Sequence, residues 1–153
     1  MKNTSSRPFL KWVGGKTRLI PSILPLLPNV HRLIEPFVGA GSIFLAREFE
    51  NLLLADINPV LIALYKRIQS DAQGFLGDLR PLFSEEYRSS KAFLRLRKQY
   101  NSPTTSISEK TVLIVYINKF GFNGLYRMNR SGECNTSYVH PERVPNFAFA
   151  CEK

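Results

Sequence analysis

The chain has 153 residues, of which 44% are hydrophobic, and this length and composition are typical of one globular domain with a buried core. No stretch reaches the roughly 18 apolar residues of a membrane span, and the first fifteen residues lack an apolar run of signal-peptide length, so we expect no membrane segment and a cytoplasmic location. The 21 Lys and Arg residues against 12 Asp and Glu give a formal net charge of +9, which suggests a polyanionic partner, with nucleic acid first and an acidic membrane surface second.

The cysteines give no sign of a metal site. Cys134 and Cys151 do not form a close pair, and no histidine is spaced to complete a zinc site with them. We therefore expect reduced structural thiols and no bound metal.

The first candidate functional segment covers residues 9–16 and has the sequence FLKWVGGK. The longer G-x-x-x-x-G-K-[ST] spacing of a phosphate loop is missing, which argues against an ATPase. Lys16 instead follows a backbone bend, where its ammonium group can meet a ligand carboxylate. The alternatives are that Trp12 is a core aromatic and Lys16 a solvated surface residue. Closely spaced prolines predict that any helix in residues 17–27 is short or starts at Pro21.

Residues 31–56 organise the chain and predict a strand, a glycine turn, a helix and a second strand. This βαβ pattern indicates a parallel sheet with strands buried on both faces, and a ligand at the carboxyl ends of the strands. Gly39 and Gly41 let the backbone turn tightly beside the ligand. Asp56, after the second strand, can accept hydrogen bonds from two ribose hydroxyls.

The glycine pattern favours S-adenosylmethionine (AdoMet) over a dinucleotide. Phe44 stands where the dinucleotide fingerprint has its third glycine, so a pyrophosphate is disfavoured. The alternative is that the glycines only form a turn and that Asp56 only caps the next helix. After Asp56, Asn58 and Pro59 predict a helix start, and an apolar stripe on that helix is expected to pack on the sheet.

A basic helix is expected in residues 84–100. Its i, i+3, i+7 and i+10 positions form one stripe that can follow a phosphate backbone or simply face solvent. The basic residues of this stripe are Arg88, Lys91, Arg95 and Lys98.

The segment after residue 105 combines a helix start with an aromatic loop. Ser106 and Glu109 have the spacing of a capping box, which favours a helix over a strand for the β-branched run in residues 112–117. Residues 118–130 hold glycines, aromatics, asparagines and basic residues, the groups that contact or wedge bases, although a turn with buried aromatics would have the same composition. Residues 131–140 are expected to be a loop, and residues 145–151 suit a third strand.

Three stretches in this order resemble the Dam-like family of DNA adenine-N6 methyltransferases: residues 9–16, residues 35–42 (EPFVGAGS) with 55–58 (ADIN), and residues 118–129 (NKFGFNGLYRMN). Members of that family transfer the AdoMet methyl group to N6 of an adenine flipped out of duplex DNA, often within GATC. The resemblance implies AdoMet as cofactor and double-stranded DNA as partner.

The resemblance also assigns roles to individual residues. The implied cofactor residues share the first two blocks and are Trp12, Lys16, Phe37, Gly39, Gly41 and Asp56. The implied DNA contacts outside the basic stripe are Lys11, Phe122, Asn123, Leu125 and Arg127, with Arg127 matching a residue that contacts guanine.

Two departures from the family accompany these matches. The family's catalytic Asp-Pro-Pro-Tyr motif, which orients the adenine amino group, is missing, since no Pro-Pro dipeptide occurs in the sequence. In the family this motif follows the strand that residues 146–152 resemble, so we expect a chain truncated before it, with no catalytic residues of its own. Residues 134–138 also replace a proline-containing run of the family, which puts recognition of the last base of GATC in doubt.

The expected fold class is α/β, with an incomplete Rossmann-like AdoMet-dependent methyltransferase core and an inserted α-helical target-recognition region. Residues 9–70 form the cofactor part, residues 71–140 the recognition region, and residues 141–153 the return to the core. The expected function is site-specific DNA adenine-N6 methylation, with transfer by this chain alone at background. The alternatives are a non-catalytic DNA-binding remnant and, more weakly, an NAD-dependent enzyme.

Overall fold

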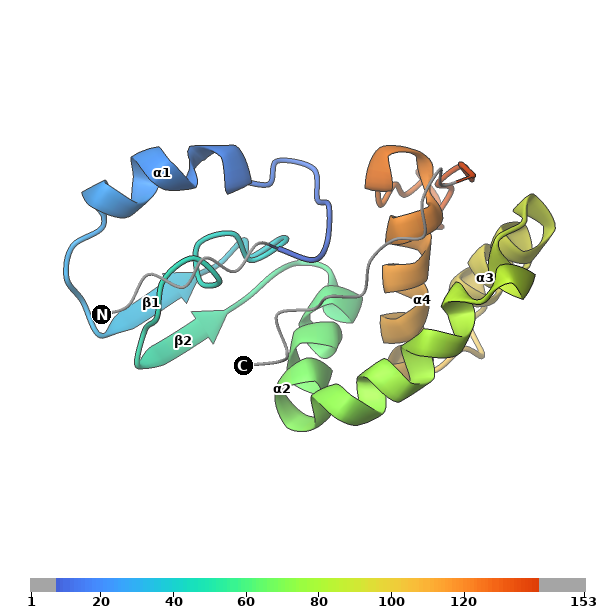
Figure 1. Ribbon diagram of the computed structural model, residues 1–153, viewed down its shortest axis with the longest axis horizontal. Coiled ribbons are helices and arrows are strands. Elements are labelled where there is room, and N and C mark those ends of the chain that lie inside the picture. Colours follow the sequence, from blue (N-terminus) through green and yellow to red (C-terminus); the bar gives the residue numbers. More distant parts are fainter. Residues whose placement is uncertain (1–7, 141–153) are drawn as a thin grey trace.

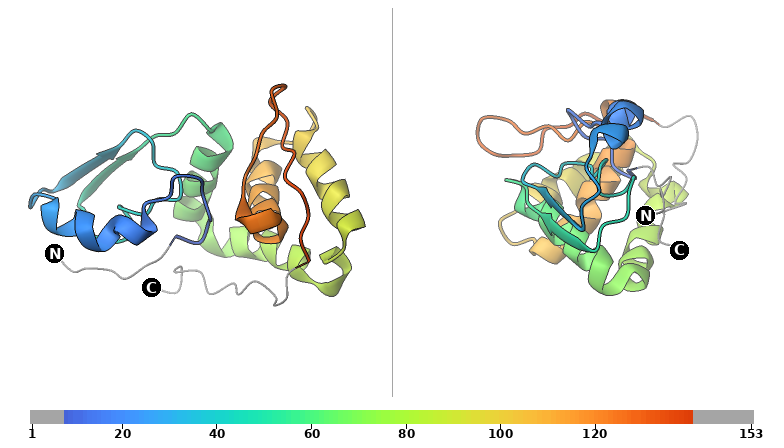
Figure 2. Two further views of the ribbon diagram at one scale, coloured as in Figure 1. Left: turned by 90° about the horizontal axis from the view of Figure 1, so that it is seen from above. Right: turned by 90° about the vertical axis from the view of Figure 1, so that its left-hand side faces the viewer.

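The structure is a computed structural model that describes residues 8–140. Its elements are η1 (Thr17–Leu19), α1 (Ile20–Ile23), η2 (Leu24–Leu26), β1 (Arg32–Glu35), β2 (Asn51–Leu54), α2 (Pro59–Leu79), η3 (Arg80–Phe83), η4 (Glu85–Tyr87), α3 (Ser90–Asn101), α4 (Ile107–Phe120) and η5 (Phe122–Gly124). Figure 1 shows α1 and the two strands at one end of the molecule, α3 and α4 at the other, and α2 between them. The fold is a small sheet beside a group of helices, and Figure 2 shows the same division from two further sides.

The strands pair as the sequence predicts. β1 and β2 are parallel neighbours with Glu35 opposite Leu54, and the pairing continues where the Ala55 amide donates to the Glu35 carbonyl at 2.8 Å. The expected burial of both strand faces is wrong, because Ile34 and Leu53 are 57% and 58% exposed. The described residues form only two strands, so this sheet is too narrow to bury its own apolar side chains.

The expected helix between the strands is also wrong, since residues 36–50, all of them described, form turns. Gly39 and Gly41 both adopt left-handed backbone angles, with φ of +49° and +73°, which a right-handed helix does not contain. The Phe44 ring then folds over Gly41, where a Cβ atom would lie 2.2 Å from the ring. The predicted glycine turn is therefore present, whereas the helix expected after it is replaced by further turns.

Helix α2 begins where the sequence predicts. The Asn58 side chain accepts hydrogen bonds from the amides of Val60 and Leu61, and Pro59 occupies the first turn. Its apolar stripe is buried at Leu61 and Leu64, but the helix packs chiefly on α4, not on the sheet as expected. The short helix α1 around Pro21 agrees with the prediction for residues 17–27.

Helix α4 is the centre of the core. The capping box is present, because the Ser106 side chain accepts from the Glu109 amide while Glu109 accepts from the Ser106 amide. Every residue from 111 to 118 is buried, as expected of a helix that neighbours surround on all sides. The β-branched run is therefore a helix, as the capping signal predicts, and α2 and α3 pack against it.

Helix α3 starts later than the sequence predicts. It begins at Ser90, because the Ser89 side chain caps the Ala92 amide, and residues 84–88 form a separate 3-10 turn. Arg88 therefore precedes the helix and does not belong to the expected stripe. Its guanidinium pairs with Glu85 and donates to the Phe83 carbonyl, and its side chain is only 19% exposed.

The predicted loop in residues 131–140 is the returning arm of a hairpin. Isolated antiparallel bridges join Gly121 to Tyr138 and Met128 to Cys134, and Gly132 turns the chain at φ of +76°. Figure 2 shows this hairpin extending from the helical end of the molecule. We call residues 121–139 the recognition hairpin.

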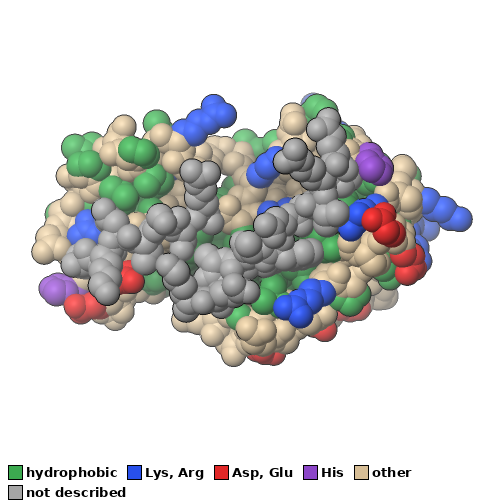
Figure 3. Space-filling model, viewed as in Figure 1, with side chains coloured by type: hydrophobic (Ala, Val, Ile, Leu, Met, Phe, Trp, Pro, Cys, Tyr) green, Lys and Arg blue, Asp and Glu red, His purple; other side chains and the backbone are tan. Residues whose placement is uncertain are grey.

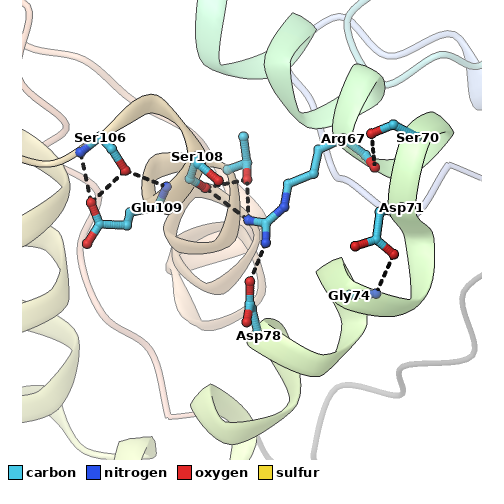
Figure 4. A network of polar contacts seen from close by, with 9 residues as sticks. Arg67, Ser70, Asp71, Gly74, Asp78, Ser106, Ser108 and Glu109 are labelled. Carbon is cyan, nitrogen blue, oxygen red and sulfur yellow. Dashed lines mark hydrogen bonds and ion pairs between the residues drawn. The ribbon is translucent and has the colours of Figure 1, made fainter.

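A polar network fixes α2 to α4 across a kink. The backbone of α2 leaves helical geometry at Asp71, whose carboxylate accepts the Gly74 amide at 2.8 Å. Arg67, one turn earlier, donates to the Ser108 carbonyl at 3.1 Å and pairs with Asp78 beyond the kink (Figure 4). The expected boundary between residues 70 and 71 falls at this kink in α2, and the division into parts stays a prediction.

The types of exposed side chain differ between the two ends of the molecule. Figure 3 shows hydrophobic side chains gathered over the α1 end, where Leu19 and Leu26 are exposed, and Lys and Arg side chains projecting at the α3 end beside acidic ones. In residues 8–140, no helix is long and apolar enough to cross a membrane. The same residues contain no group of three or more His, Cys, Asp or Glu suited to a metal ion. The expected third strand in residues 145–151 lies outside the described residues.

Candidate functional site

The carboxyl ends of the two strands converge on the glycine turn. Asp56, just after β2, accepts the Gly39 amide on Oδ2 and the Asn58 amide on Oδ1, each at 3.0 Å. The hydroxyl of Tyr65 on α2 donates to the Gly39 carbonyl at 2.7 Å. Both backbone groups of Gly39 are therefore held, and the turn is fixed between the sheet and α2.

The carboxylate of Asp56 keeps capacity for a ligand. A carboxylate has about four lone-pair sites on two oxygens, and the two backbone amides use one on each oxygen. The helix cap is Asn58, so the alternative in which Asp56 merely caps α2 is wrong. Asp56 is only partly buried, so its remaining lone pairs are accessible.

A second carboxylate lies at the same edge. Glu35 ends β1, and its Oε2 is buried with no hydrogen-bond partner among the described residues. Burial raises the pKa of the Glu35 carboxyl above its usual range, against the opposing effect of a backbone hydrogen bond from Phe44. Burial also raises the pKa of Tyr65, and the negative charges of Glu35 and Asp56 add to this rise, which places both carboxyls near its hydroxyl. The Oε2 atom of Glu35 therefore accepts no hydrogen bond from the described residues.

The segment around Trp12 lies against the glycine turn. A Cβ atom on Gly39 would lie 3.1 Å from the indole Cδ1, so the ring edge touches this glycine. The hydroxyls of Thr17 and Ser42 are 3.2 Å apart and join the same two segments. The structure therefore brings three of the predicted cofactor residues together: Trp12, Gly39 and Asp56.

The other predicted cofactor residues lie around this group. Gly41 is buried beneath the Phe44 ring and shapes the turn. Phe37 is 88% exposed, with its side chain in solvent. Lys16 is exposed, and its Nζ donates to the Gly14 carbonyl at 2.7 Å. The roles of these residues in cofactor binding stay predictions.

Asn118 holds the amino-terminal segment to the recognition hairpin. This buried amide accepts the Lys11 amide at 3.0 Å and donates to the carbonyls of Lys11 at 2.7 Å and Gly124 at 2.6 Å. The next residue, Lys119, donates to the Phe9 carbonyl, and burial together with the nearby Lys11 charge lowers its pKa. Sequence reasoning grouped Asn118 with possible base contacts, but its buried position assigns it a structural role.

The 3-10 turn η5, at the base of the recognition hairpin, and the residues that follow it carry most of the predicted DNA contacts. Phe122 and Leu125 are 53% and 37% exposed, and Asn123 has a left-handed φ of +53°. The stem of Lys11 packs on Gly124, where a Cβ atom would lie 2.6 Å from Lys11 Cδ. Lys11 therefore lies beside η5, and its role in DNA binding stays a prediction.

Arg127 is held on the hairpin by its own neighbours. Its Nε donates to the Asn135 side-chain oxygen at 2.8 Å, and its amide donates to the buried hydroxyl of Thr136 at 3.1 Å. The Thr136 hydroxyl in turn donates to the Leu125 carbonyl at 2.8 Å. Hydrogen bonds of Thr136 thus fix the backbone that carries the exposed guanidinium.

The basic stripe of α3 does not face the hairpin. Phe93 and Tyr100 on the buried side of α3 contact Tyr138 and Tyr126 of the hairpin. At 100° per residue, the positions that carry the exposed basic side chains lie on the opposite side of the helix. These residues are Lys91, Arg95 and Lys98.

The chain also matches a protein family and known proteins in sequence. A family model described as D12 class N6 adenine-specific DNA methyltransferase matches residues 12–146. The chain belongs to this family. It is 42% identical over 134 residues to a DNA adenine methylase of Haemophilus influenzae, an alignment that covers 86% of this chain and 46% of the relative. It is also 39% identical over 161 residues to the DNA adenine methylase of Escherichia coli K12, covering 96% of this chain and 58% of the relative.

Membership of the D12 class confirms the family that the three sequence blocks resemble. A DNA adenine methylase of Vibrio cholerae gives the same result, with 42% identity over 86% of this chain. The chain spans about half the length of these relatives. The family favours a methyltransferase over the NAD-dependent alternative.

Proposed function

We propose that this D12-class chain binds AdoMet at the glycine turn and duplex DNA at the recognition hairpin, as part of an adenine-N6 methyltransferase with a Rossmann-like core and an inserted recognition region. The observation that carries the proposal is the convergence of Trp12, Gly39 and Asp56 at the carboxyl ends of two parallel strands. This edge is where α/β sheets bind ligands.

The residues present fit AdoMet. The free lone pairs of Asp56 suit the two ribose hydroxyls, and the unpartnered Oε2 of Glu35 supports the fit because it suits a cationic amino group. The Trp12 indole offers an aromatic wall, and Lys16 and Phe37 are exposed beside this site. When bound, AdoMet supplies an electrophilic methyl group on its sulfonium. The chain's own contribution is to hold the turn, place the two carboxyl groups where a ligand needs them, and position bound DNA.

DNA binding is proposed for two surfaces. Lys11, Phe122, Asn123, Leu125 and Arg127 form the first, at the base of the recognition hairpin, where Arg127 suits a guanine edge and Phe122 or Leu125 suits a wedge between bases. The second is the basic face of α3, which suits phosphates without sequence preference. We leave Arg88 out of the second surface because Glu85 already neutralises its guanidinium.

Cofactor binding is tested by calorimetric titration of the purified chain with AdoMet. We expect saturable binding that is lost in Asp56→Ala and retained in Glu48→Ala, which removes an exposed carboxylate from the same crossover. Equal binding by Asp56→Ala and the wild type would contradict the assignment of Asp56. Absence of AdoMet binding by a folded chain would favour the alternative, a DNA-binding remnant.

DNA binding is tested by polarisation of a labelled GATC-containing duplex at several salt concentrations. Arg127→Ala should weaken binding and reduce the preference for GATC over a scrambled duplex, whereas Arg32→Ala, at the amino end of β1, should not. Neutralising Lys91, Arg95 and Lys98 together should flatten the salt dependence by up to about 0.9 per lost phosphate contact. A slope unchanged by this triple replacement would remove α3 from the interface.

Methyl transfer by this chain alone is expected to stay at background. The family's Asp-Pro-Pro-Tyr motif does not occur in these residues, so no group here orients the adenine amine. Clear incorporation of labelled methyl groups into a GATC duplex would contradict this expectation.

A further inference from the structure

Tyr126 lies in the recognition hairpin but contacts both sides of the candidate cofactor site. Its ring stacks on the Trp12 indole, with centroids 5.3 Å apart and an interplanar angle of 12°. Burial raises the pKa of its hydroxyl, and hydrogen bonds with the Tyr100 and Asn58 side chains oppose this rise. Trp12 and Asn58 are the neighbours of Gly39 and Asp56, respectively.

These contacts form a closed ring. Asp56 accepts the amides of Gly39 and Asn58, the Asn58 side chain meets Tyr126, the Tyr126 ring stacks on Trp12, and the Trp12 edge returns to Gly39. Four members come from the strand ends and the amino-terminal segment, and Tyr126 alone comes from the hairpin. The indole is thus clamped between a glycine on one side and a hairpin tyrosine on the other.

The position of Tyr126 is itself fixed from outside the ring. Its hydroxyl is 2.7 Å from the hydroxyl of Tyr100 on α3, and the two rings meet edge to face at 6.0 Å. Burial raises the pKa of Tyr100 above its usual range, so the pair stays neutral and hydrogen-bonded at physiological pH. Tyr126 is therefore anchored in the helical part while its ring reaches the cofactor edge.

We infer that Tyr126 is a positioning residue for the cofactor, which acts by holding the Trp12 indole against the glycine turn. This inference rests on the proposed function, because it needs AdoMet to bind beside Trp12. It assigns one face of a DNA-recognition hairpin to the cofactor site. The adjacent residue, Arg127, is turned toward Asn135 and serves the DNA side.

The test compares AdoMet affinity in variants of neighbouring hairpin residues. Tyr126→Ala removes the stack and should weaken AdoMet binding by about twofold to tenfold, the range expected for one aromatic pair. Tyr126→Phe keeps the stack and should restore most of the affinity. Tyr138→Ala should leave AdoMet affinity unchanged, because it removes a hairpin aromatic that packs on Phe93 instead.

A spectroscopic measurement separates positioning from general destabilisation. Trp12 is the only tryptophan in the sequence, so its emission reports its own environment. Tyr126→Ala should shift this emission in the absence of ligand, whereas Tyr138→Ala should not. If Tyr126→Ala does not fold, Tyr126→Leu gives the same comparison with a retained apolar volume.

The outcomes distinguish this inference from the proposed function. A wild-type chain that does not bind AdoMet overturns both. A wild-type chain that binds AdoMet, together with a folded Tyr126→Ala variant of equal affinity, overturns the positioning role alone. Loss of affinity in Tyr138→Ala equal to that in Tyr126→Ala would also overturn it, since the effect would then belong to the hairpin as a whole.

Discussion

Replacing Asn118 with alanine should cost a large share of the stability of this fold. The side chain is 1% exposed and makes three hydrogen bonds, two with the backbone of Lys11 and one with the Gly124 carbonyl. At about 1 kcal/mol net for each bond, the loss is about 3 kcal/mol. A domain of this size has only about 5–15 kcal/mol of stability, so the variant should be visibly weakened.

Urea unfolding followed by Trp12 emission measures this loss, because Trp12 adjoins Lys11. With a slope of about 1–3 kcal/mol per molar urea, the midpoint should fall by about 1–3 M. Asn118→Asp keeps the shape and the acceptor for the Lys11 amide but sets an oxygen against two carbonyls, so it should lose at least as much. Asn51→Ala, an exposed asparagine on β2, is the control and should change stability by less than about 0.5 kcal/mol. A loss below about 1 kcal/mol in Asn118→Ala would refute the reasoning.

Three further predictions concern the packing around the site. Arg67→Ala should lower the free energy of unfolding by about 1–3 kcal/mol because it opens the network between α2 and α4, whereas Lys66→Ala, an exposed neighbour, should not. Gly74→Ala should destabilise the fold, since a Cβ atom would lie 2.0 Å from the carboxylate of Asp71, which caps the kink. Gly77→Ala is the control, because a Cβ atom there meets no atom within 4 Å, and this variant should be neutral or stabilise by up to about 1 kcal/mol. Thermal melting compares the two variants. Glu35→Gln should raise stability at pH 7 and lose this advantage at acidic pH. Burial raises the pKa of the Glu35 carboxyl, and a carboxyl with a raised folded-state pKa stabilises the fold only at low pH, so this contribution is lost as pH rises. Equal melting temperatures of Glu35→Gln and wild type at pH 7 would contradict it.

The features that depend on local contacts were predicted best from the sequence. The starts of α2 and α4 follow from Asn58 and Ser106, whose side chains cap amides two or three residues away. The position of Asp56 after β2 follows equally from a short pattern. The stripe on α3 failed at Arg88 because a competing 3-10 turn, invisible to helical periodicity, recruits that side chain.

The features that depend on contacts between distant segments were predicted less well. The glycine turn at Gly39 and Gly41 forms as predicted, but the helix expected after it does not, and the chain up to β2 forms turns instead. No spacing rule connects Trp12 to Tyr126, because their stack depends on how α4 places the hairpin. Tyr65 was not predicted as a site residue. The signal for it was a tyrosine within an apolar helix stripe, since a buried phenol needs a partner for its hydroxyl.

The Lys11 to Asn118 contact has a consequence for the order of folding. Its two partners are 107 residues apart, whereas the contact of Gly39 with Asp56 spans 17 residues. Closing the longer loop costs more chain entropy and must wait until α4 exists, so we expect the glycine turn to form early and the Trp12 wall to be added last. Pulse-labelled hydrogen exchange should then show protection of the Gly39 amide before that of Lys11, and a chain still emerging from the ribosome would hold half of its cofactor site.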